Sequence, residues 1–287
     1  MYESRRLKEE ANLTAEIEQR VRRLLPFTTH QIELPNGLWT MPSGRSKGTV
    51  FLDLRVKTLM DHSGGSLTGK RVLDLGCLEG GFSLYLAKQG AREVVGIEAR
   101  ELNYERCLLL KDFFKLSNLT FHKSDVRMVR NDWLGEFDII FAGGILYHLD
   151  DPYVVLQQLS QMVKDFLLVD THVALREYRI FPKHKLSRHI TERLFEGETY
   201  PGRWATEFQP TASHQEIEES NWSSWGNAKS FWLLEESLVR MLMRLGFPNV
   251  SKVYNTPGYN RCAEGCPEGC RVILVAKKTW NLSSTTG

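Results

Sequence analysis

Short apolar runs alternate with amphipathic segments along the middle of the chain. The runs, each of which predicts a strand, cover residues 71–75, 93–97, 119–122, 137–141 and 166–169. Their continuous apolar character suits strands that are buried on both faces. The segments between them predict helices over residues 81–88, 102–116 and onward from 151. This alternation predicts a parallel sheet with helices on both of its faces.

The same rhythm returns near the C-terminus. Four leucines at helical spacing predict a helix that ends at Gly246, and they are Leu234, Leu238, Leu242 and Leu245. Apolar runs at 250–254 and 272–276 predict a closing pair of strands. The expected fold class is therefore α/β, with a Rossmann-like sheet of seven mostly parallel strands whose last strand is antiparallel.

Local signals place helix starts and turns outside this core. Asp151 followed by Pro152 predicts a helix start, with an acidic cap and proline at the first helical position. Asn36-Gly37 predicts a hairpin turn. Helices are expected over residues 11–25 and 50–61, so residues 1–66 form an N-terminal extension to a domain of residues 67–287.

The rhythm breaks over residues 174–232. This stretch is polar, is rich in His, Arg, Trp and Tyr, and lacks sustained periodicity. A long segment of this kind in a compact domain is typically a lid or a binding loop. We expect it to be a substrate lid inserted after the fifth strand.

Composition limits the class of protein. Hydrophobic content of 42%, charged content of 25% and a net charge of +2 are ordinary for a soluble protein and favour no whole-molecule attraction to nucleic acid. The first six residues do not begin a signal peptide, and no run of apolar residues is long enough to span a membrane. We expect a cytoplasmic protein without a membrane span.

The turn after the first strand of the predicted sheet carries the first candidate chemistry. Asp74 ends that strand, and Gly76 and Gly80 lie in the turn that leads into the next helix. Glycine lacks a Cβ, so the backbone can bend sharply there and approach a ligand. The spacing is not Gly-x-Gly-x-x-Gly, which disfavours a dinucleotide-binding dehydrogenase.

Acidic residues follow the next two strands. Glu98 is placed to accept hydrogen bonds from both hydroxyls of a ribose, and Asp125 from the amino group of adenine. A merely well-packed core would not need acids at successive strand ends. The residues expected to bind the cofactor are Asp74, Gly76, Cys77, Gly80, Phe82, Glu98, Ala99, Asp125, Val126 and Gly143.

This ordered set resembles the motifs of class I S-adenosylmethionine-dependent methyltransferases over residues 68–175. Leu78 stands where the commonest pattern of that family has a second glycine. The resemblance implies S-adenosylmethionine as the cofactor and methyl transfer as the reaction.

A narrower resemblance involves Leu146-Tyr147-His148, which is similar to a segment of the tRNA wobble-uridine (carboxy)methyltransferase family. In its carboxymethyl members a tyrosine, an arginine and an upstream lysine hold the extra carboxylate of the cofactor. Tyr147 and Arg271 match the first two, whereas the register over residues 51–57 leaves the third position open. Ordinary methyl transfer is therefore favoured over carboxymethyl transfer.

The methyl donor is already activated, so the protein must mainly align it and, for an oxygen nucleophile, remove a proton. His148 is the leading candidate base, with a helix-capping role as its alternative, and His172 is the second. Tyr147 is expected to form a pocket wall. The candidate substrate-binding residues are Tyr147, Arg271, Trp225 and Arg179, the last from the basic part of the predicted lid.

Three cysteines precede the final strand, at Cys262, Cys266 and Cys270. Their spacing differs from that of common zinc sites, so no metal is predicted. Metal binding, redox pairing and unreactive loop cysteines all stay open at this point.

These observations predict a methyltransferase that acts on an oxygen, nitrogen or carbon nucleophile of a small-molecule acceptor. The near-neutral net charge of the chain and an aromatic site covered by a lid favour that partner. A tRNA-modifying (carboxy)methyltransferase is the alternative, favoured by the Leu146-Tyr147-His148 segment and the basic lid. A non-catalytic scaffold that only binds the cofactor is the third possibility.

Overall fold

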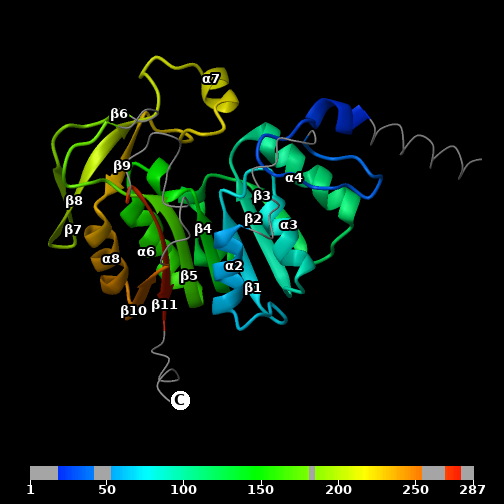
Figure 1. The fold of residues 1–287 in the computed structure, drawn as a ribbon, viewed down its shortest axis with the longest axis horizontal. Coiled ribbons are helices and arrows are strands. Elements are labelled where there is room, and N and C mark those ends of the chain that lie inside the picture. Colours follow the sequence, from blue (N-terminus) through cyan, green and yellow to red (C-terminus); the bar gives the residue numbers. More distant parts are fainter. Residues whose placement is uncertain (1–18, 42–52, 181–184, 254–268, 279–287) are drawn as a thin grey trace, which may run out of the picture.

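The computed structural model describes residues 19–41, 53–180, 185–253 and 269–278. A seven-stranded sheet forms its centre (Figure 1). Its strands are β1 (Arg71–Leu75), β2 (Glu93–Glu98), β3 (Leu119–Lys123), β4 (Phe137–Gly143), β5 (Val163–His172), β10 (Asn249–Lys252) and β11 (Arg271–Lys277). The order across the sheet is β10-β11-β5-β4-β1-β2-β3.

The pairing confirms the predicted fold class. Strands β1 to β5 pair in parallel, and β11 runs antiparallel to both β5 and β10. The chain steps outward from β1 to β3 and then returns to β4 on the other side of β1. Ligands of open α/β sheets bind at such a switch point, beyond the carboxyl ends of the strands.

Helices cover both faces, as predicted. They are α2 (Leu54–His62), α3 (Gly81–Lys88), α4 (Glu101–Phe114), α6 (Pro152–Met162) and α8 (Glu235–Arg244), with the short α5 (Asn131–Leu134). Successive strand residues point to opposite faces, so Val72 packs with α2, α3 and α4 while Leu73 packs with α6 and α8. Two apolar cores, one on each face, therefore hold the strand ends rigidly.

The start of α6 differs from the prediction in one respect. Pro152 does occupy the first turn, but the Asp151 side chain makes no capping hydrogen bond. Its carboxylate instead pairs with Arg193 at 3.1 Å. The ion pair with the inserted segment has replaced the local cap.

Residues 174–232, the expected lid in whose sequence no sustained periodicity was found, contain regular structure. They contain a second, antiparallel sheet of β6 (Lys185–Leu186), β7 (Thr191–Phe195), β8 (Glu198–Thr206) and β9 (Lys229–Leu233), with β8 paired to the other three. The short helix α7 (His214–Glu219) lies at the top of the view, between the second sheet and the half of the central sheet that carries β3 (Figure 1). Glu196 and Gly197, at φ 43° and 82°, form the tight turn between β7 and β8. Two positive φ values are typical of the turn that matches strand twist.

The described part of the N-terminal extension agrees with the prediction. Residues 19–24 are helical, and Val21 and Leu24 pack on Leu109 of α4. Glu33 and Trp39 pair across the hairpin, with Gly37 at φ 80° in its turn. The extension therefore lies against the helix that follows β2.

Candidate cofactor and acceptor site

The loop after β1 bends sharply and is closely packed. Gly76 has φ 64° and Gly80, the N-cap of α3, has φ 77°. A Cβ on Gly76 would lie 2.9 Å from Cδ1 of Ile145, and one on Gly80 would lie 3.0 Å from Cζ of Phe121. The left-handed conformation therefore favours glycine at both positions, and a Cβ would also require the neighbouring side chains to shift.

Leu78 adopts the left-handed conformation without being glycine, with φ 53°. Its N–H donates to Oε2 of Glu98 at 3.0 Å, and its carbonyl accepts from the thiol of Cys107 at 3.2 Å. The family resemblance predicts glycine at this position, and the left-handed backbone conformation found here also favours glycine. These two contacts hold the strained residue in place.

Two buried carboxylates flank this loop. Asp74 accepts a hydrogen bond from the Ser83 hydroxyl at 2.5 Å, and burial raises its pKa to about 6. Glu98 accepts from the backbone N–H groups of Leu78 and Arg100, at 3.0 and 2.8 Å, on different oxygens. Burial raises the pKa of Glu98 to about 7, against the lowering effect of these hydrogen bonds.

Glu98 fits a partner with vicinal hydroxyls. Each of its carboxylate oxygens accepts one backbone N–H and keeps capacity for a second donor. Two hydroxyls of a ribose are such donors. The carboxylate of Glu98, beside the glycine loop, therefore fits the ribose of a nucleoside cofactor.

Asp125 and Val126 follow β3, on the same side of the sheet. Val126 is buried, and Ala99 is half-buried beside Glu98. The Asp125 carboxylate is engaged by the guanidinium of Arg127 at 2.5 to 3.0 Å and also caps its own turn. An adenine amino group at Asp125 would share this carboxylate with Arg127.

The inserted segment reaches across these strand ends. Arg100, two residues after Glu98, donates to the carbonyls of Ser223 and Ser224 at 2.9 and 3.0 Å. Arg127, two residues after Asp125, donates to the carbonyl of Trp225 at 2.6 Å. We call residues 223–227 the strap. Its two arginine contacts place it next to the ribose and adenine candidates.

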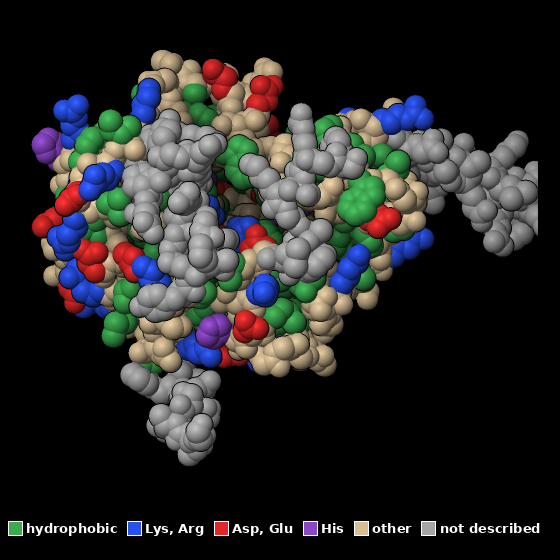
Figure 2. Space-filling view, in the orientation of Figure 1, with side chains coloured by type: hydrophobic (Ala, Val, Ile, Leu, Met, Phe, Trp, Pro, Cys, Tyr) green, Lys and Arg blue, Asp and Glu red, His purple; other side chains and the backbone are tan. Residues whose placement is uncertain are grey.

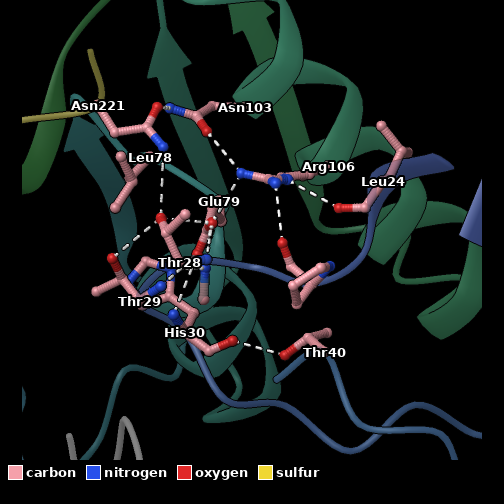
Figure 3. Close-up of polar contacts among 12 residues, drawn as sticks. Leu24, Thr28, Thr29, His30, Thr40, Leu78, Glu79, Asn103, Arg106 and Asn221 are labelled. Atoms are coloured by element: carbon pink, nitrogen blue, oxygen red, sulfur yellow. Dashed lines mark hydrogen bonds and ion pairs between the residues drawn. The ribbon is translucent and has the colours of Figure 1, made fainter. Parts of the chain in front are cut away.

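A polar network supports the back of the cofactor loop (Figure 3). Glu79 accepts hydrogen bonds from the backbone N–H groups of Thr28, Thr29 and His30 at 2.5, 3.0 and 3.1 Å, and from Arg106 at 3.0 Å. Asn103 of α4 continues the network to Asn221 at 3.2 Å. The N-terminal extension, the cofactor loop, α4 and the insertion therefore meet at one carboxylate.

Beyond β4 the site becomes aromatic. Gly143 ends the strand, and the 3₁₀ turn Leu146–His148 follows it. The Tyr147 ring lies 4.3 Å from His172 and 5.8 Å from Trp232, and His172 stacks on Trp232 at 4.9 Å. We call Tyr147, His148, His172 and Trp232 the aromatic mouth. All four are at most 9% exposed.

Charged residues lie next to this mouth. Asp170 is fully buried, and Arg271 donates to its two oxygens at 2.8 and 2.5 Å. A second arginine, Arg55 of α2, donates to Asp170 at 3.3 Å and lies 4.6 Å above the ring of Phe82. Arg271 and Tyr147 converge on Gly144, whose ideal Cβ would lie 3.8 Å from each. Among the described residues 53–57, Arg55 is thus the basic side chain that reaches Asp170, the carboxylate to which Arg271 also donates.

Sequence reasoning missed Glu207, which follows β8. Its Oε1 lies 3.1 Å from Nδ1 of His148, so an inserted carboxylate contacts the leading candidate base. His148 itself lies in the 3₁₀ turn before α6, and its side chain caps no helix. Nothing local in the sequence marks Glu207, because 59 residues separate it from His148.

The remaining predicted residues lie apart or serve packing. Arg179 is exposed and pairs with Glu177 at 2.7 Å, away from the aromatic mouth. Cys77 is buried, with its sulfur 3.8 Å from that of Cys107. Cys270 is disulfide-bonded, which favours redox pairing, whereas Cys262 and Cys266 lie outside the described residues. The described ranges contain no cluster of metal-ligating side chains.

Figure 2 shows acidic and basic side chains meeting in a hollow near the centre of this face. The hollow lies between the second sheet and the half of the central sheet that carries β1 to β3.

Comparison with known proteins identifies the family. The family model described as a methyltransferase domain matches residues 50–252, which is most of the chain. The chain belongs to the methyltransferase domain family. This methyltransferase family uses S-adenosylmethionine.

Curated relatives of this methyltransferase match over shorter stretches. The ubiquinone biosynthesis O-methyltransferase of Acinetobacter baylyi is 29% identical over 111 residues, which cover 39% of this chain and 46% of that protein. The tRNA U34 carboxymethyltransferase of Dichelobacter nodosus is 32% identical over 111 residues, 39% of this chain and 34% of that protein. The matches thus span less than half the length of either relative.

Solved structures show the same fold. The N-terminal domain of EvdMO1, crystallised in the presence of SAH and D-fucose, has a TM-score of 0.67 and 21% identity, covering 92% of this chain and 96% of that one. A methyltransferase from Mesorhizobium loti has a TM-score of 0.52 and 15% identity, covering 79% and 99%. Within the described residues, no helix has the length and apolar character needed to cross a membrane.

Proposed function

We propose that this methyltransferase transfers a methyl group to a nucleophilic O, N or C atom of a small-molecule acceptor. The observation that carries the proposal is the aromatic mouth. Tyr147 and His148 come from the turn after β4, His172 ends β5 and Trp232 lies in β9, and each ring is almost fully buried. Aromatic side chains together with a small number of placed polar and charged groups are typical of the lining of a small-ligand site.

The chain's own residues have separable roles in this proposal. Asp74, Glu98 and the glycine loop hold the cofactor, with Asp125 and Val126 beside its base. Tyr147 and Trp232 enclose the acceptor and exclude water, which keeps the reacting atoms in line. The cofactor, when bound, supplies a methyl group on a cationic sulfur.

The insertion closes the site from the other side. Trp232 of β9 donates its indole N–H to the Tyr147 carbonyl at 2.8 Å, and the Phe231 N–H donates to the Leu149 carbonyl at 2.8 Å. The second sheet is therefore hydrogen-bonded to the turn that carries Tyr147 and His148. This arrangement supports a fixed pocket in preference to an open groove for RNA.

One observation favours a second candidate, modification of a wobble uridine in tRNA. Tyr147 and Arg271 lie close together, as the carboxymethyl resemblance would require, and Arg55 stands near them where the resemblance calls for a lysine. Asp170 already accepts from both arginines and offsets part of their charge. A carboxylated cofactor would have to compete with Asp170, so plain methyl transfer remains the proposal.

Mass spectrometry of the nucleoside that co-purifies with the full chain separates the two candidates. We expect S-adenosylmethionine or its demethylated product, and the carboxylated form would favour the tRNA candidate. Methyl transfer is then measured with D-fucose, catechol, aniline and unmodified tRNA as acceptors. Transfer to tRNA alone would contradict the proposal, and cofactor binding without any transfer would favour a scaffold.

A further inference from the structure

Glu207 is a buried carboxylate that receives three hydrogen bonds. Ser230 donates its hydroxyl at 2.6 Å, Ser224 donates its backbone N–H at 3.2 Å, and His148 Nδ1 lies at 3.1 Å. The side chain is 5% exposed. Burial alone would raise the pKa of Glu207, but these hydrogen bonds outweigh it and hold the pKa below its ordinary value. The carboxylate is therefore ionised at neutral pH.

An ionised carboxylate determines the tautomer of its histidine partner. A carboxylate only accepts hydrogen bonds, so Nδ1 of His148 carries the proton. In the neutral ring the lone pair then resides on Nε2. Nε2 of His148 has no hydrogen-bond partner in the described ranges. The fully buried polar atoms without a partner do not include it, so this nitrogen is not completely buried.

The backbone of His148 is held as firmly as its ring. Asn227 of the strap donates to the His148 carbonyl at 3.0 Å, and Trp232 donates to the preceding carbonyl at 2.8 Å. The insertion therefore contacts His148 through its side chain, its carbonyl and its neighbour Tyr147. A histidine used only for packing would not need this arrangement.

We propose that Glu207 is a positioning residue that fixes His148 as a general base, and that the acceptor atom is a hydroxyl oxygen. The inference rests on the proposed function and specifies its acceptor. As the hydroxyl oxygen forms its bond to the methyl carbon, His148 Nε2 takes the hydroxyl proton. The carbon–sulfur bond breaks with its electron pair passing to sulfur, which becomes neutral, and Glu207 stabilises the resulting imidazolium.

The chemistry of the acceptor explains why the dyad points to oxygen. A hydroxyl is a weak nucleophile until its proton leaves, so a positioned base accelerates its reaction by about 10²- to 10⁴-fold. A neutral aromatic amine attacks through its own lone pair and needs no base in that step. An ionised glutamate behind the histidine also stabilises the imidazolium that forms.

The kinetic test compares Glu207→Gln with Glu219→Gln, a matched change on the exposed surface of α7 in the same insertion. D-fucose and catechol serve as hydroxyl probes and aniline as the amine probe. We expect transfer to a hydroxyl probe, a loss in kcat of about 100-fold in Glu207→Gln with KM within about 3-fold, and wild-type kinetics in Glu219→Gln. Equal transfer to aniline, or an unchanged kcat in Glu207→Gln, would overturn the proposal.

A measurement without an acceptor tests the positioning role separately. Long-range ¹H–¹⁵N spectra of the ¹⁵N-labelled full chain report which ring nitrogen carries the proton, and His148→Gln assigns the signal. We expect His148 to be protonated at Nδ1, and we expect its signals to change in Glu207→Gln but not in Glu219→Gln. Protonation at Nε2 in the wild type would overturn the positioning role, even if the protein folds and methylates normally. A failed transfer assay with an Nδ1–H signal would instead count against the proposed function and the hydroxyl acceptor.

Discussion

Arg106 and Glu79 form an ion pair of 3.0 Å between side chains that are 7% and 0% exposed. Arg106 also donates to the carbonyls of Leu24 and Pro26 at 3.0 Å each. The pair thus joins α4 and the cofactor loop to the N-terminal extension at a site that excludes water. Removal of one partner would leave the other charge buried without compensation.

We expect Glu79→Gln to lower the free energy of unfolding by about 3 kcal/mol, because Arg106 loses its counter-charge. The matched control is Glu105→Gln, at the position just before Arg106 on α4. Its exposed ion pair with Arg23 should contribute less than about 0.5 kcal/mol to the free energy of unfolding. Urea denaturation of both variants measures the difference. Equal losses in the two variants would show that burial of the Glu79 pair has no special importance.

The strained backbone at Leu78 predicts an inverted preference between alanine and glycine. Both substitutions keep the two backbone hydrogen bonds and remove the side chain beyond Cβ, but only glycine adopts φ 53° without strain. We expect Leu78→Gly to be more stable than Leu78→Ala by about 1 kcal/mol. At Met243, exposed in α8, the order should be reversed by about 1 kcal/mol. Thermal denaturation of the four variants tests this, and the same order at both positions would refute it.

Glu98 predicts a pH dependence of stability in the cofactor-free protein. Its folded-state pKa of about 7 lies above the ordinary value of 4.5, so the folded protein binds this proton more tightly than the unfolded chain does. The stability from this group is fully present below pH 4.5 and is lost as the pH rises through about 7. Relative to Glu98→Gln, the wild type should lose up to about 3 kcal/mol between pH 5 and 8. Denaturation curves that keep a constant difference across this range would contradict the assignment.

The strap predicts a change in the rate of product release. Arg127→Met removes the hydrogen bond to the Trp225 carbonyl and the pairing with Asp125. We expect S-adenosylhomocysteine to dissociate at least about 10-fold faster, since a hydrogen bond from a charged donor contributes about 1.5 to 3 kcal/mol. Arg130→Met, an exposed neighbour, is the control. Stopped-flow rates that are equal in the two variants would show that the strap does not retain the nucleoside.

The central sheet could be predicted because strands that are buried on both faces have continuous apolar runs in the sequence. Predicted and observed bounds coincide at β1 and α3 and differ by a few residues at β4 and β5. The second sheet could not be predicted in this way. Strand β6 is only two residues long, β7 has no buried residue, and β8 mixes buried with partly exposed positions. Within β8, Arg203 is buried by donating to four backbone carbonyls. The turn at Glu196-Gly197 was the available local signal.

The residues of the candidate site also fall into those that could be predicted from the sequence and those that could not. Asp74, Glu98 and Asp125 lie at or just beyond the carboxyl ends of strands that the sequence predicts, so their shared edge could be inferred. Glu207 and Arg55 depend on contacts between distant segments, and Arg55 lies 115 residues from Asp170 in the sequence. Such partners become visible only when the insertion and α2 are placed against the sheet.

Calorimetric titration of S-adenosylmethionine into the full chain tests the central claim most directly. The account predicts saturable binding at one site in the wild type and in Asp132→Ala, an exposed acid on α5. It predicts no detectable binding in Asp74→Ala or Glu98→Ala, provided that circular dichroism shows both variants to be folded. Wild-type affinity in either folded variant would contradict the assignment of the cofactor to this edge of the sheet.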